Sequence, residues 1–360
     1  MKQIEIILKN FLLRILLLLV KRNDKDYVPV FNEKSNILFI RLNRIGDALV
    51  VTPLLHQIKD SLKCEISILA ASSNHFIFEN NPSIDHIILF NKGLGSFFET
   101  LKLIKRERYD AVVDLHDDVS TTVSFLIALC QAKNKFGLRK SNEIVYSRTV
   151  ERPDPKVTHV VDRIFEIARL FNVKISKESA GICYQPEEHS VNNVKNILLR
   201  KFKDKKYLIG MNITAGSKAR FWGIENFQMV LKFLSQYDVN VLIITTTKDV
   251  EKALQITSDD RDKIFYSPLF DEFAATVSCL DFLFTPDTSI IHLASAYNVP
   301  VFGLYVKYNT EDMIWSPYRT DFESMTTTNY NLTAISAEET LKKLKPFLEK
   351  HIYEFRNTKM

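Results

Sequence analysis

The sequence predicts an α/β fold with two Rossmann-like, doubly wound domains, preceded by an amphipathic N-terminal helix. A length of 360 residues is typical of a two-domain protein. From residue 35 onward, short β-branched apolar runs alternate with longer helical stretches, a pattern typical of parallel sheets covered on both faces. The pattern stops near residue 185 and restarts at residue 207. Two such units in succession predict a ligand cleft between them.

The first domain is expected at residues 35–185. Each of its strands is a short apolar run followed by a stretch with helical periodicity. We expect strands at Asn36–Leu42, Glu65–Ala70, His86–Phe90 and Ala111–Asp114, and helices at Asp47–Leu62, Ser96–Arg108, Ser120–Gln131 and Thr158–Phe171.

The second domain is expected at residues 186–335. Residues 185–206 are polar and lysine-rich and include Pro186, which is typical of a linker. Strands are then expected at Tyr207–Ile213, Asn240–Thr245, Lys263–Tyr266, Asp281–Thr285 and Pro300–Tyr305, with helices at about 225–237, 249–257, 270–279 and 288–297. The segment 336–360 should form a last helix, Ala337–Phe355, that packs back toward the N-terminal domain.

Residues 1–34 form a separate segment whose apolar part, residues 4–20, is interrupted by Glu5, Lys9 and Arg14. A spanning helix needs about 20 predominantly apolar residues, and no small-residue cleavage site follows. The segment carries seven Lys/Arg and four Asp/Glu, so it supplies +3 of the net charge of +5. We therefore expect a membrane-interface helix and linker, with anionic headgroups near the basic residues. A helix packed on the protein's own surface and a transmembrane anchor are the alternatives.

Composition excludes several kinds of site. Average usage would give roughly 25 glycines, but the chain has 9 and contains neither a Gly-Lys pair nor a Gly-x-Ser-x-Gly motif. The nearest dinucleotide fingerprint, residues 93–98, has Phe98 in place of its third glycine, which disfavours an oxidoreductase. The four cysteines are scattered, and we expect neither a metal nor another cofactor. Residues 35–360 carry only +2, so we expect no nucleic-acid partner.

Three loops carry the candidate chemistry. The first runs from Arg41 to Pro53, after the first strand, and contains Gly46 and Asp47. The carboxyl end of a parallel strand is where open α/β sheets bind ligands. Gly46 would allow a positive φ or a close backbone approach. Asp47 would be either a helix N-cap or a general base for an acceptor hydroxyl.

The second loop, residues 212–227, follows the first strand of the second domain. It gathers hydroxyls, backbone N–H groups and the cations Lys218 and Arg220 around Gly216, which suits a diphosphate. The alternative is a solvated basic loop anchored in the core by Trp222. The third loop, Asp287-Thr288-Ser289 with His292 one turn later, could bind an anion, or could cap a helix beside a buried histidine.

Together, these segments resemble glycosyltransferase family 9, the heptosyltransferase family of lipopolysaccharide assembly. The resemblance covers roughly residues 35–350. It rests on Arg41-Leu42, Gly46-Asp47 and Thr52-Pro53, on Tyr109-Asp110 and Asp114-Leu115, on the loop ending at Trp222, and on Asp287 to Ala294. The chain departs from the family pattern at Arg220, where Lys is usual, at Gly223, where Pro is usual, and at Ser289, where Gly is usual.

The resemblance implies a GT-B fold and inverting, metal-independent transfer of a heptose or related sugar from a nucleotide-diphosphate donor, ADP-heptose above all. The acceptor would be a lipid-linked or lipopolysaccharide-core saccharide, and the enzyme would sit peripherally on the cytoplasmic face of the inner membrane. Asp47 would be the base and Arg220, or else Lys218, the cation that neutralises the diphosphate. The donor would contact Thr214, Gly216, Ser217, Lys218, Asp287, Thr288, Ser289 and His292, with its ribose on Glu251 or else Asp249, and the acceptor would contact Arg41, Asn43 and Arg44. The departures leave a second hypothesis open, a catalytically silent homologue that binds nucleotide-sugar or glycolipid as a scaffold.

Overall fold

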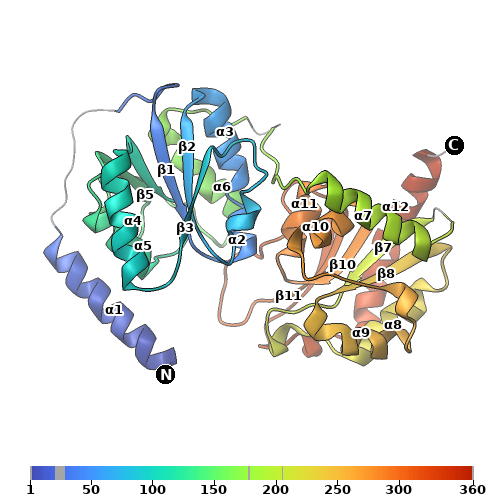
Figure 1. The fold of residues 1–360 in the computed structure, drawn as a ribbon. Helices are drawn as coiled ribbons and strands as arrows, with labels where there is room; N and C mark the ends of the chain where they lie inside the picture. Colours follow the sequence, from blue (N-terminus) through green and yellow to red (C-terminus); the bar gives the residue numbers. More distant parts are fainter. Residues whose placement is uncertain (1, 21–28, 177–178, 205, 359–360) are drawn as a thin grey trace. The chain divides into compact units, whose positions relative to one another are not determined.

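The structure, a computed structural model, describes residues 2–20, 29–176, 179–204 and 206–358, with the backbone alone for residues 2–10. Residues 21–28 of the expected N-terminal linker lie outside this set. The chain forms two compact units, Met1–Cys183 and Tyr184–Met360 (Figure 1).

The N-terminal unit has a six-stranded parallel sheet in the order β3-β2-β1-β4-β5-β6. This is the strand order of the dinucleotide-binding Rossmann fold, in which the order reverses between β1 and β4. The four predicted strands are confirmed, whereas β5 and the edge strand β6 were not predicted. The strands are β1 (Asn36–Arg41), β2 (Glu65–Ala71), β3 (His86–Phe90), β4 (Ala111–Asp114), β5 (Asn134–Leu138) and β6 (Arg148–Val150).

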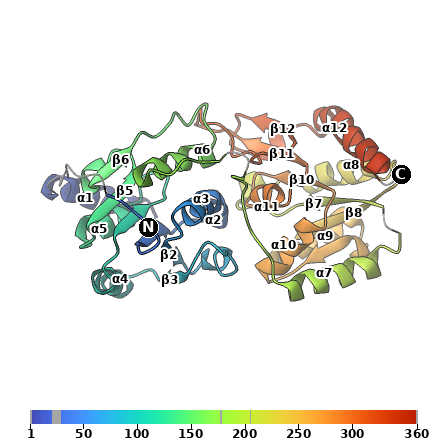
Figure 2. The same ribbon diagram turned by 90° about the horizontal axis from the view of Figure 1, so that it is seen from above.

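Helices cover both faces of this sheet, with α4 and α5 on one side and α2, α3 and α6 on the other (Figures 1 and 2). Their bounds are α2 (Ile45–Leu49), α3 (Thr52–Leu62), α4 (Leu94–Glu107), α5 (Thr121–Leu129) and α6 (Val160–Phe165), which continues as a 3₁₀ helix over Glu166–Phe171.

The single helix predicted at Asp47–Leu62 is wrong, because the chain breaks at Val50 and Val51. Pro53 has no N–H to donate to the carbonyl of Leu49, four residues earlier. The hydroxyl of Thr52 donates to that carbonyl instead, at 2.8 Å, and α3 starts afresh with Pro53 in its first turn.

The C-terminal unit repeats the topology. Its sheet order is β12-β11-β10-β7-β8-β9, again all parallel, so the order reverses between β7 and β10. The five predicted strands are confirmed to within one residue at each end, and the edge strand β12 was not predicted. The strands are β7 (Tyr207–Asn212), β8 (Val239–Thr245), β9 (Ile264–Tyr266), β10 (Phe282–Pro286), β11 (Val301–Val306) and β12 (Phe322–Thr327).

The linker predicted at residues 185–206 is wrong, since most of it is the helix α7 (Glu188–Lys201). Its buried residues Ser190, Val194 and Leu198 recur every four positions, so a helical stripe was present within a polar sequence. α7 packs on α10 (Phe270–Ser278), where the amide of Asn193 donates to Glu272 at 2.6 Å. The other helices of this unit are α8 (Ile224–Leu234), α9 (Val250–Thr257), α11 (Ile290–Ala296) and α12 (Ala337–Thr358).

The last helix, α12, belongs to the C-terminal unit. Its residues Leu344, Leu348 and Ile352 are buried in that unit's core, and it packs on α8 and β12. The expectation that this helix packs back toward the N-terminal domain does not account for its apolar face, because the core of its own unit buries that face.

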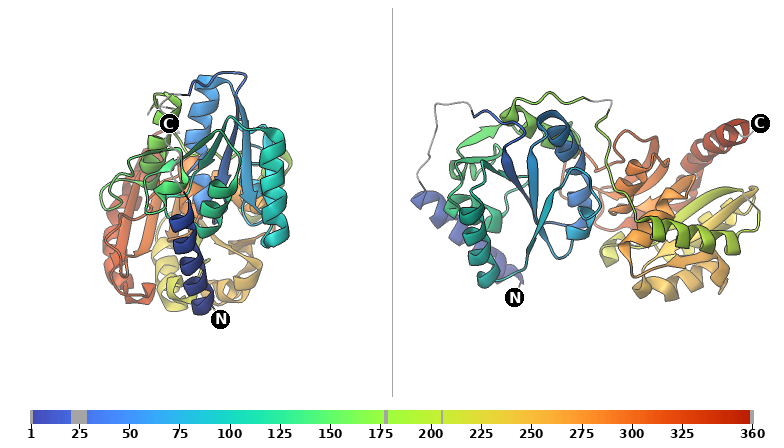
Figure 3. Two further views of the ribbon diagram at one scale, coloured as in Figure 1. Left: turned by 90° about the vertical axis from the view of Figure 1, so that its left-hand side faces the viewer. Right: turned by 45° about the horizontal axis from the view of Figure 1, so that its top comes forward.

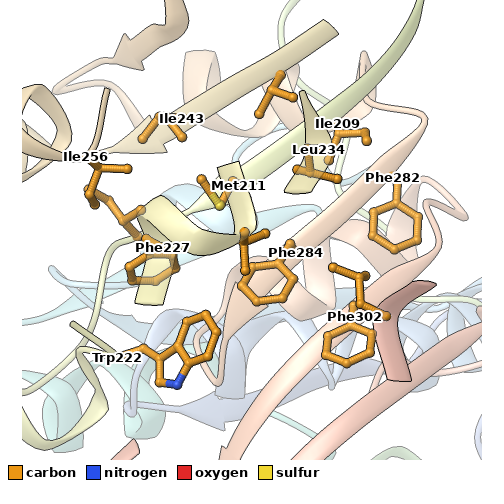
Figure 4. Packing of buried hydrophobic residues seen from close by; sticks show 14 of the residues in the cluster. Ile209, Met211, Trp222, Phe227, Leu234, Ile243, Ile256, Phe282, Phe284 and Phe302 are labelled. Atoms are coloured by element: carbon orange, nitrogen blue, oxygen red, sulfur yellow. The ribbon is translucent and has the colours of Figure 1, made fainter. Parts of the chain in front are cut away.

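The core of the C-terminal unit is aromatic (Figure 4). Trp222 is fully buried, meets Phe227 edge-on at 5.5 Å between ring centroids, and lies 5.7 Å from Phe284. Its indole N–H donates to the carbonyl of Ile335 at 2.9 Å. The anchoring of the second loop by Trp222 is therefore confirmed, and this anchor fixes the end of a loop that carries candidate site residues.

The N-terminal helix α1 (Lys2–Leu19) runs along the outside of its unit, in dark blue in Figure 3. Leu16 is buried in a cluster with residues of α5, and Leu13, Leu17 and Val20 pack against that cluster. Phe11, Leu12, Ile15, Leu18 and Leu19 of the same helix are exposed, the last two at 85% and 76%. None of the helices in the described part of the chain is long and apolar enough to cross a membrane.

Replacement of Trp222 by alanine should destabilise the C-terminal unit by about 3–5 kcal/mol, because it removes a fully buried indole and leaves a cavity. Urea denaturation followed by circular dichroism measures this loss. Tyr353→Ala is the control, because Tyr353 is 69% exposed on α12. It should change the free energy of unfolding by less than about 0.5 kcal/mol. Equal midpoints for the two variants would contradict the packing described for Trp222.

Candidate active site

The first candidate residue, Asp47, is fixed by a buried arginine at the end of β1. The guanidinium of Arg41 donates from Nε to the backbone carbonyl of Asp47 at 2.8 Å and from Nη2 to its carboxylate Oδ1 at 2.6 Å. Its third contact, from Nη1, goes to the carbonyl of Leu115 after β4, at 2.5 Å. Arg41 is fully buried, whereas the Asp47 side chain is 17% exposed. The base candidate therefore stands at the reversal point of the sheet, with part of its carboxylate open to solvent.

Asp47 is the third residue of α2, and the N-cap of that helix is Arg44. The N-cap alternative therefore does not explain Asp47. Gly46 is also inside α2, and the glycines with positive φ in the described chain are Gly93 and Gly223. Of the two roles considered for Gly46, a positive φ is therefore ruled out, and close backbone approach stays a prediction.

A second buried polar cluster surrounds Asp114 at the end of β4. Its Oδ1 accepts from His116 Nδ1 at 2.6 Å, and its Oδ2 accepts from the Tyr146 hydroxyl at 2.6 Å and from Lys140 Nζ at 3.0 Å. Burial by itself raises the pKa of Asp114, but Lys140 and His116 outweigh it and hold that pKa well below its usual value. Asp114 is therefore a structural carboxylate that stays ionised.

His116 is held in one tautomer. The backbone N–H of Leu42, the residue after β1, donates to Nε2 at 3.3 Å, so Nε2 carries no proton and Nδ1–H donates to Asp114. Burial lowers the pKa of His116, although Asp114 opposes that shift. A neutral histidine thus joins the ends of β1 and β4 beside the bridge that Arg41 makes.

Asp117 forms a closed ion-pair cluster after β4. Both of its oxygens accept from Arg152 Nε and Nη2, at 3.1 and 2.9 Å, and from Arg163 Nε and Nη2, at 3.0 and 2.7 Å. Burial alone raises the pKa of Asp117, but the two guanidinium groups lower it to about 2. This cluster ties the β4 loop to α6.

The three predicted acceptor residues lie in different environments. Asn43 and Arg44 are exposed in the loop between β1 and Asp47. Arg41 is fully buried, and each of its guanidinium nitrogens already has an acceptor. Direct acceptor binding by Arg41 does not fit this geometry, because its side chain is buried and each guanidinium nitrogen already donates to the protein.

In the C-terminal unit, Asn212 makes the corresponding link across the reversal point. It is the last residue of β7 and is fully buried. Its amide donates to the hydroxyl of Thr285 on β10 at 2.9 Å and to that of Thr288 at 3.3 Å, while its carbonyl accepts from the Thr214 N–H at 3.1 Å. The second and third candidate loops are therefore brought together by one side chain.

Arg220 spans the same two loops. Its Nη2 lies 3.3 Å from the Asp287 carboxylate Oδ2 and its Nη1 donates to the Asp287 backbone carbonyl at 3.3 Å. Gly216, Ser217 and Lys218 are exposed, and Lys218 forms no ion pair within the described residues. Of the two candidate cations, Arg220 is the one held at the strand ends.

The other predicted donor residues differ in position. Thr288 and Ser289 are partly exposed where α11 begins, and His292 is buried with its ring 6.1 Å from that of Trp315. Glu251 is exposed on α9 and makes no hydrogen bond to the other candidates within the part of the chain described here. The alternative, Asp249, pairs with Lys252 at 2.6 Å.

No cluster of three or more His, Cys, Asp or Glu side chains with metal-binding geometry is found among the residues that the structure describes.

Residues 97–345, more than half of the chain, match the pattern of glycosyltransferase family 9 (heptosyltransferase). The chain belongs to glycosyltransferase family 9. It is 21% identical over 295 residues to the lipopolysaccharide core heptosyltransferase OpsX of Haemophilus influenzae, an alignment that covers 78% of this chain and 82% of OpsX.

Solved structures show the same fold. A family 9 glycosyltransferase from Veillonella parvula has a TM-score of 0.76 at 19% identity, covering 92% of this chain and 100% of that one. E. coli heptosyltransferase WaaC with ADP has a TM-score of 0.68 at 14% identity, covering 88% and 99%. The family and the GT-B fold that the sequence motifs implied are confirmed, and this protein is a glycosyltransferase.

The backbone conformation at Gly223 explains why proline is absent at this position. Gly223, where Pro is usual in family 9, has a φ of +109°. Proline is fixed near −65° and cannot adopt this conformation. The chain therefore enters α8 by a turn that the usual residue does not allow.

In this family 9 protein, Asn212 was placed in the second loop from the sequence without being given a role, and His116, Lys140 and Trp315 were missed. Asn212 ends a central strand and His116 follows one, so their positions alone could have indicated a role. Lys140 follows β5, which was not predicted, and therefore gave no usable signal.

Protonation of Asp117 should weaken the N-terminal unit at acid pH. The pKa of its carboxyl is about 2 in the folded protein, against an ordinary value of 3.8, so the unfolded chain takes up the proton first as pH falls. The stabilisation is full above about pH 4 and is lost toward about pH 2, a change of about 2 kcal/mol. Urea denaturation from about pH 6 to about pH 3 should show this decline beginning.

Asp117→Asn should lower the free energy of unfolding by about 3–5 kcal/mol at about pH 7, because Arg163 then stays buried without a carboxylate. The difference from the wild type should shrink as pH falls. The neighbouring Asp118→Asn is the matched control, since Asp118 is 88% exposed. A constant difference at all pH values would contradict the role given to Asp117.

Proposed function

We propose that this protein is an inverting, metal-independent heptosyltransferase. It moves a heptose, or a related sugar, from ADP-heptose to a lipopolysaccharide-core or other lipid-linked glycan, with Asp47 as general base. The observation that carries this proposal is the position of Asp47. In a family 9 chain, it is a partly exposed carboxylate at the reversal point of the N-terminal sheet, where open α/β sheets bind their ligands.

In the proposed reaction, Asp47 accepts the proton of the acceptor hydroxyl as that oxygen attacks the anomeric carbon. The bond from the anomeric carbon to the diphosphate oxygen breaks, and its electron pair leaves with the nucleoside diphosphate. Attack from the face opposite the diphosphate inverts the anomeric centre. The exposed Asn43 and Arg44, next to Asp47 in sequence, are suited to contact the acceptor.

The C-terminal unit would hold the donor. Arg220, 3.3 Å from Asp287, would neutralise the departing diphosphate, with Thr214, Ser217, Lys218, Thr288 and Ser289 as further contacts. Glu251 is an exposed carboxylate after β8, available to a ribose. Relatives support the nucleotide: E. coli WaaC was solved with ADP and with ADP-2-deoxy-2-fluoro heptose.

Asp47→Asn should lower kcat by about 10²–10⁴-fold, because the amide cannot accept the proton of the acceptor hydroxyl. The assay uses ADP-heptose and lipopolysaccharide from a heptose-deficient strain, with mass spectrometry of the product. ADP should still stabilise the variant in a thermal-shift measurement, since its C-terminal unit is unchanged.

Asp60→Asn is the control, because Asp60 is 68% exposed and pairs with Lys63 at the surface. It should keep wild-type kcat. Full activity of Asp47→Asn would remove Asp47 as the base. ADP-heptose binding by the wild type without turnover on any acceptor would favour a catalytically silent homologue.

We also propose that α1 holds the enzyme on the cytoplasmic face of the inner membrane. A helix packed only on its own protein exposes a polar face. Here α1 packs on the unit's core through Leu16, yet its apolar residues Phe11, Ile15, Leu18 and Leu19 are exposed. The two alternatives considered from the sequence, packing on the protein and lying in the membrane interface, are therefore compatible.

Leu18→Glu with Leu19→Glu should reduce binding to anionic phospholipid vesicles by about tenfold or more, because two side chains lose their apolar burial in the acyl boundary. Vesicle co-sedimentation at low salt measures the bound fraction. Leu199→Glu on α7 is the control, since Leu199 is also 70% exposed. Full-length protein that stays in the supernatant with such vesicles would contradict this proposal.

A further inference from the structure

Two of the three hydrogen bonds of Arg41 are directed at a single residue, Asp47. Two of its nitrogens bind Asp47, one at the backbone carbonyl and one at carboxylate Oδ1, at 2.8 and 2.6 Å. A donor fork that binds both ends of one aspartate fixes its side-chain torsions as well as its place in the chain. The rotamer of Asp47 is therefore fixed by a buried side chain that a ligand cannot reach.

The carboxylate of Asp47 is engaged on one oxygen only. Oδ2 accepts no hydrogen bond from any described residue and keeps access to solvent. Asp117, which follows β4, also pairs with a buried arginine, but it differs from Asp47. Both of its carboxylate oxygens accept hydrogen bonds from arginine side chains. The Arg41–Asp47 pair is thus half open, whereas the Arg163–Asp117 pair is closed and structural.

Arg41 is itself held rigidly. It is 0% exposed, and its remaining contact fixes it to the Leu115 carbonyl at 2.5 Å. Burial of an ionised guanidinium is costly unless every N–H group is paired. The chain keeps this charge buried at the one place where it can orient Asp47, which a purely apolar core residue could not do.

We infer that Arg41 is a positioning residue for the transfer reaction: it ties Oδ1 of Asp47 and so presents Oδ2 as the oxygen that takes the proton. The inference rests on the proposed role of Asp47 as base. A base must meet the acceptor hydroxyl within hydrogen-bond reach while the anomeric carbon lies in line, and a misplacement of about 1 Å costs about 10²-fold in rate.

Arg41→Met should lower kcat by about 10²-fold while KM for ADP-heptose stays within about threefold, because the base is displaced and donor binding is not. Arg41→Lys should have a higher kcat than Arg41→Met, since an ammonium can still bind one oxygen of Asp47. It cannot bind the carboxylate and the backbone carbonyl together as the guanidinium does. Transfer is measured with ADP-heptose and heptose-deficient lipopolysaccharide, and folding by thermal denaturation with and without ADP.

Arg163→Met is the matched control, because it removes an equally buried arginine from an Asp pair that does not touch Asp47. Folded Arg163→Met should keep kcat within about threefold of the wild type. The inference is overturned if both Met variants lose kcat equally, if Arg41→Met keeps wild-type kcat, or if Arg41→Met raises the acceptor KM with kcat unchanged, which would make Arg41 an acceptor ligand.

Asp47→Asn separates this inference from the proposed function. If Asp47→Asn is inactive and Arg41→Met is active, the base stands and only the positioning role fails. If Asp47→Asn is active, the base assignment fails. If Arg41→Met does not fold, Arg41→Lys carries the test, and a folded Arg41→Lys with wild-type kcat overturns the inference.

Discussion

The N-terminal unit depends on one buried guanidinium at the reversal point of its sheet. Arg41 joins the end of β1 to Asp47 and to the carbonyl of Leu115 after β4. At this point the chain leaves neighbouring strands toward opposite faces, so no continuous helix layer covers the strand ends. Because no helix layer covers the strand ends, a ligand can reach them. For the same reason, no helix packs on the loops there to hold them in place. The charged side chain of Arg41 holds these loops instead, through its three hydrogen bonds.

The C-terminal unit meets the same constraint with a neutral group. Asn212, like Arg41, is the last residue of its unit's first strand, is fully buried, and bonds across to the neighbouring strand end. The difference suits the proposed ligands. Beside Asp47 a cation can orient a carboxylate, whereas near a diphosphate the cation must be free to move to the phosphates. Arg220, 37% exposed on the loop, is placed where it can exchange its contact with Asp287 for one with a ligand.

The central strands of both sheets could be predicted because they are continuous apolar runs such as Asn36–Arg41 and Tyr207–Asn212. Strands β5, β6 and β12 could not, although the other edge strands, β3 and β9, were predicted. β5 reads Asn-Lys-Phe-Gly-Leu, β6 has three residues, and β12 carries polar side chains on a partly exposed edge. Their strand character comes from pairing with a neighbour already in place, which no local pattern records. α7 was missed for a different reason: its stripe of Ser190, Val194 and Leu198 was present in the sequence, but it lies within a polar stretch that resembles a linker.

The candidate site was predicted as loops and residue types, and what the sequence could not supply was the direction of side chains. Arg41, Asn43 and Arg44 are close in sequence, yet Arg41 is buried in the protein and the other two are exposed. The end of the strand decides this. Arg41 is still part of β1, where it pairs with Ala70 and where both faces are buried, whereas residues 43 and 44 have left the sheet. A polar residue at the last position of a central strand is therefore better placed to support the site from below than to touch the ligand, as Asn212 does in the second unit.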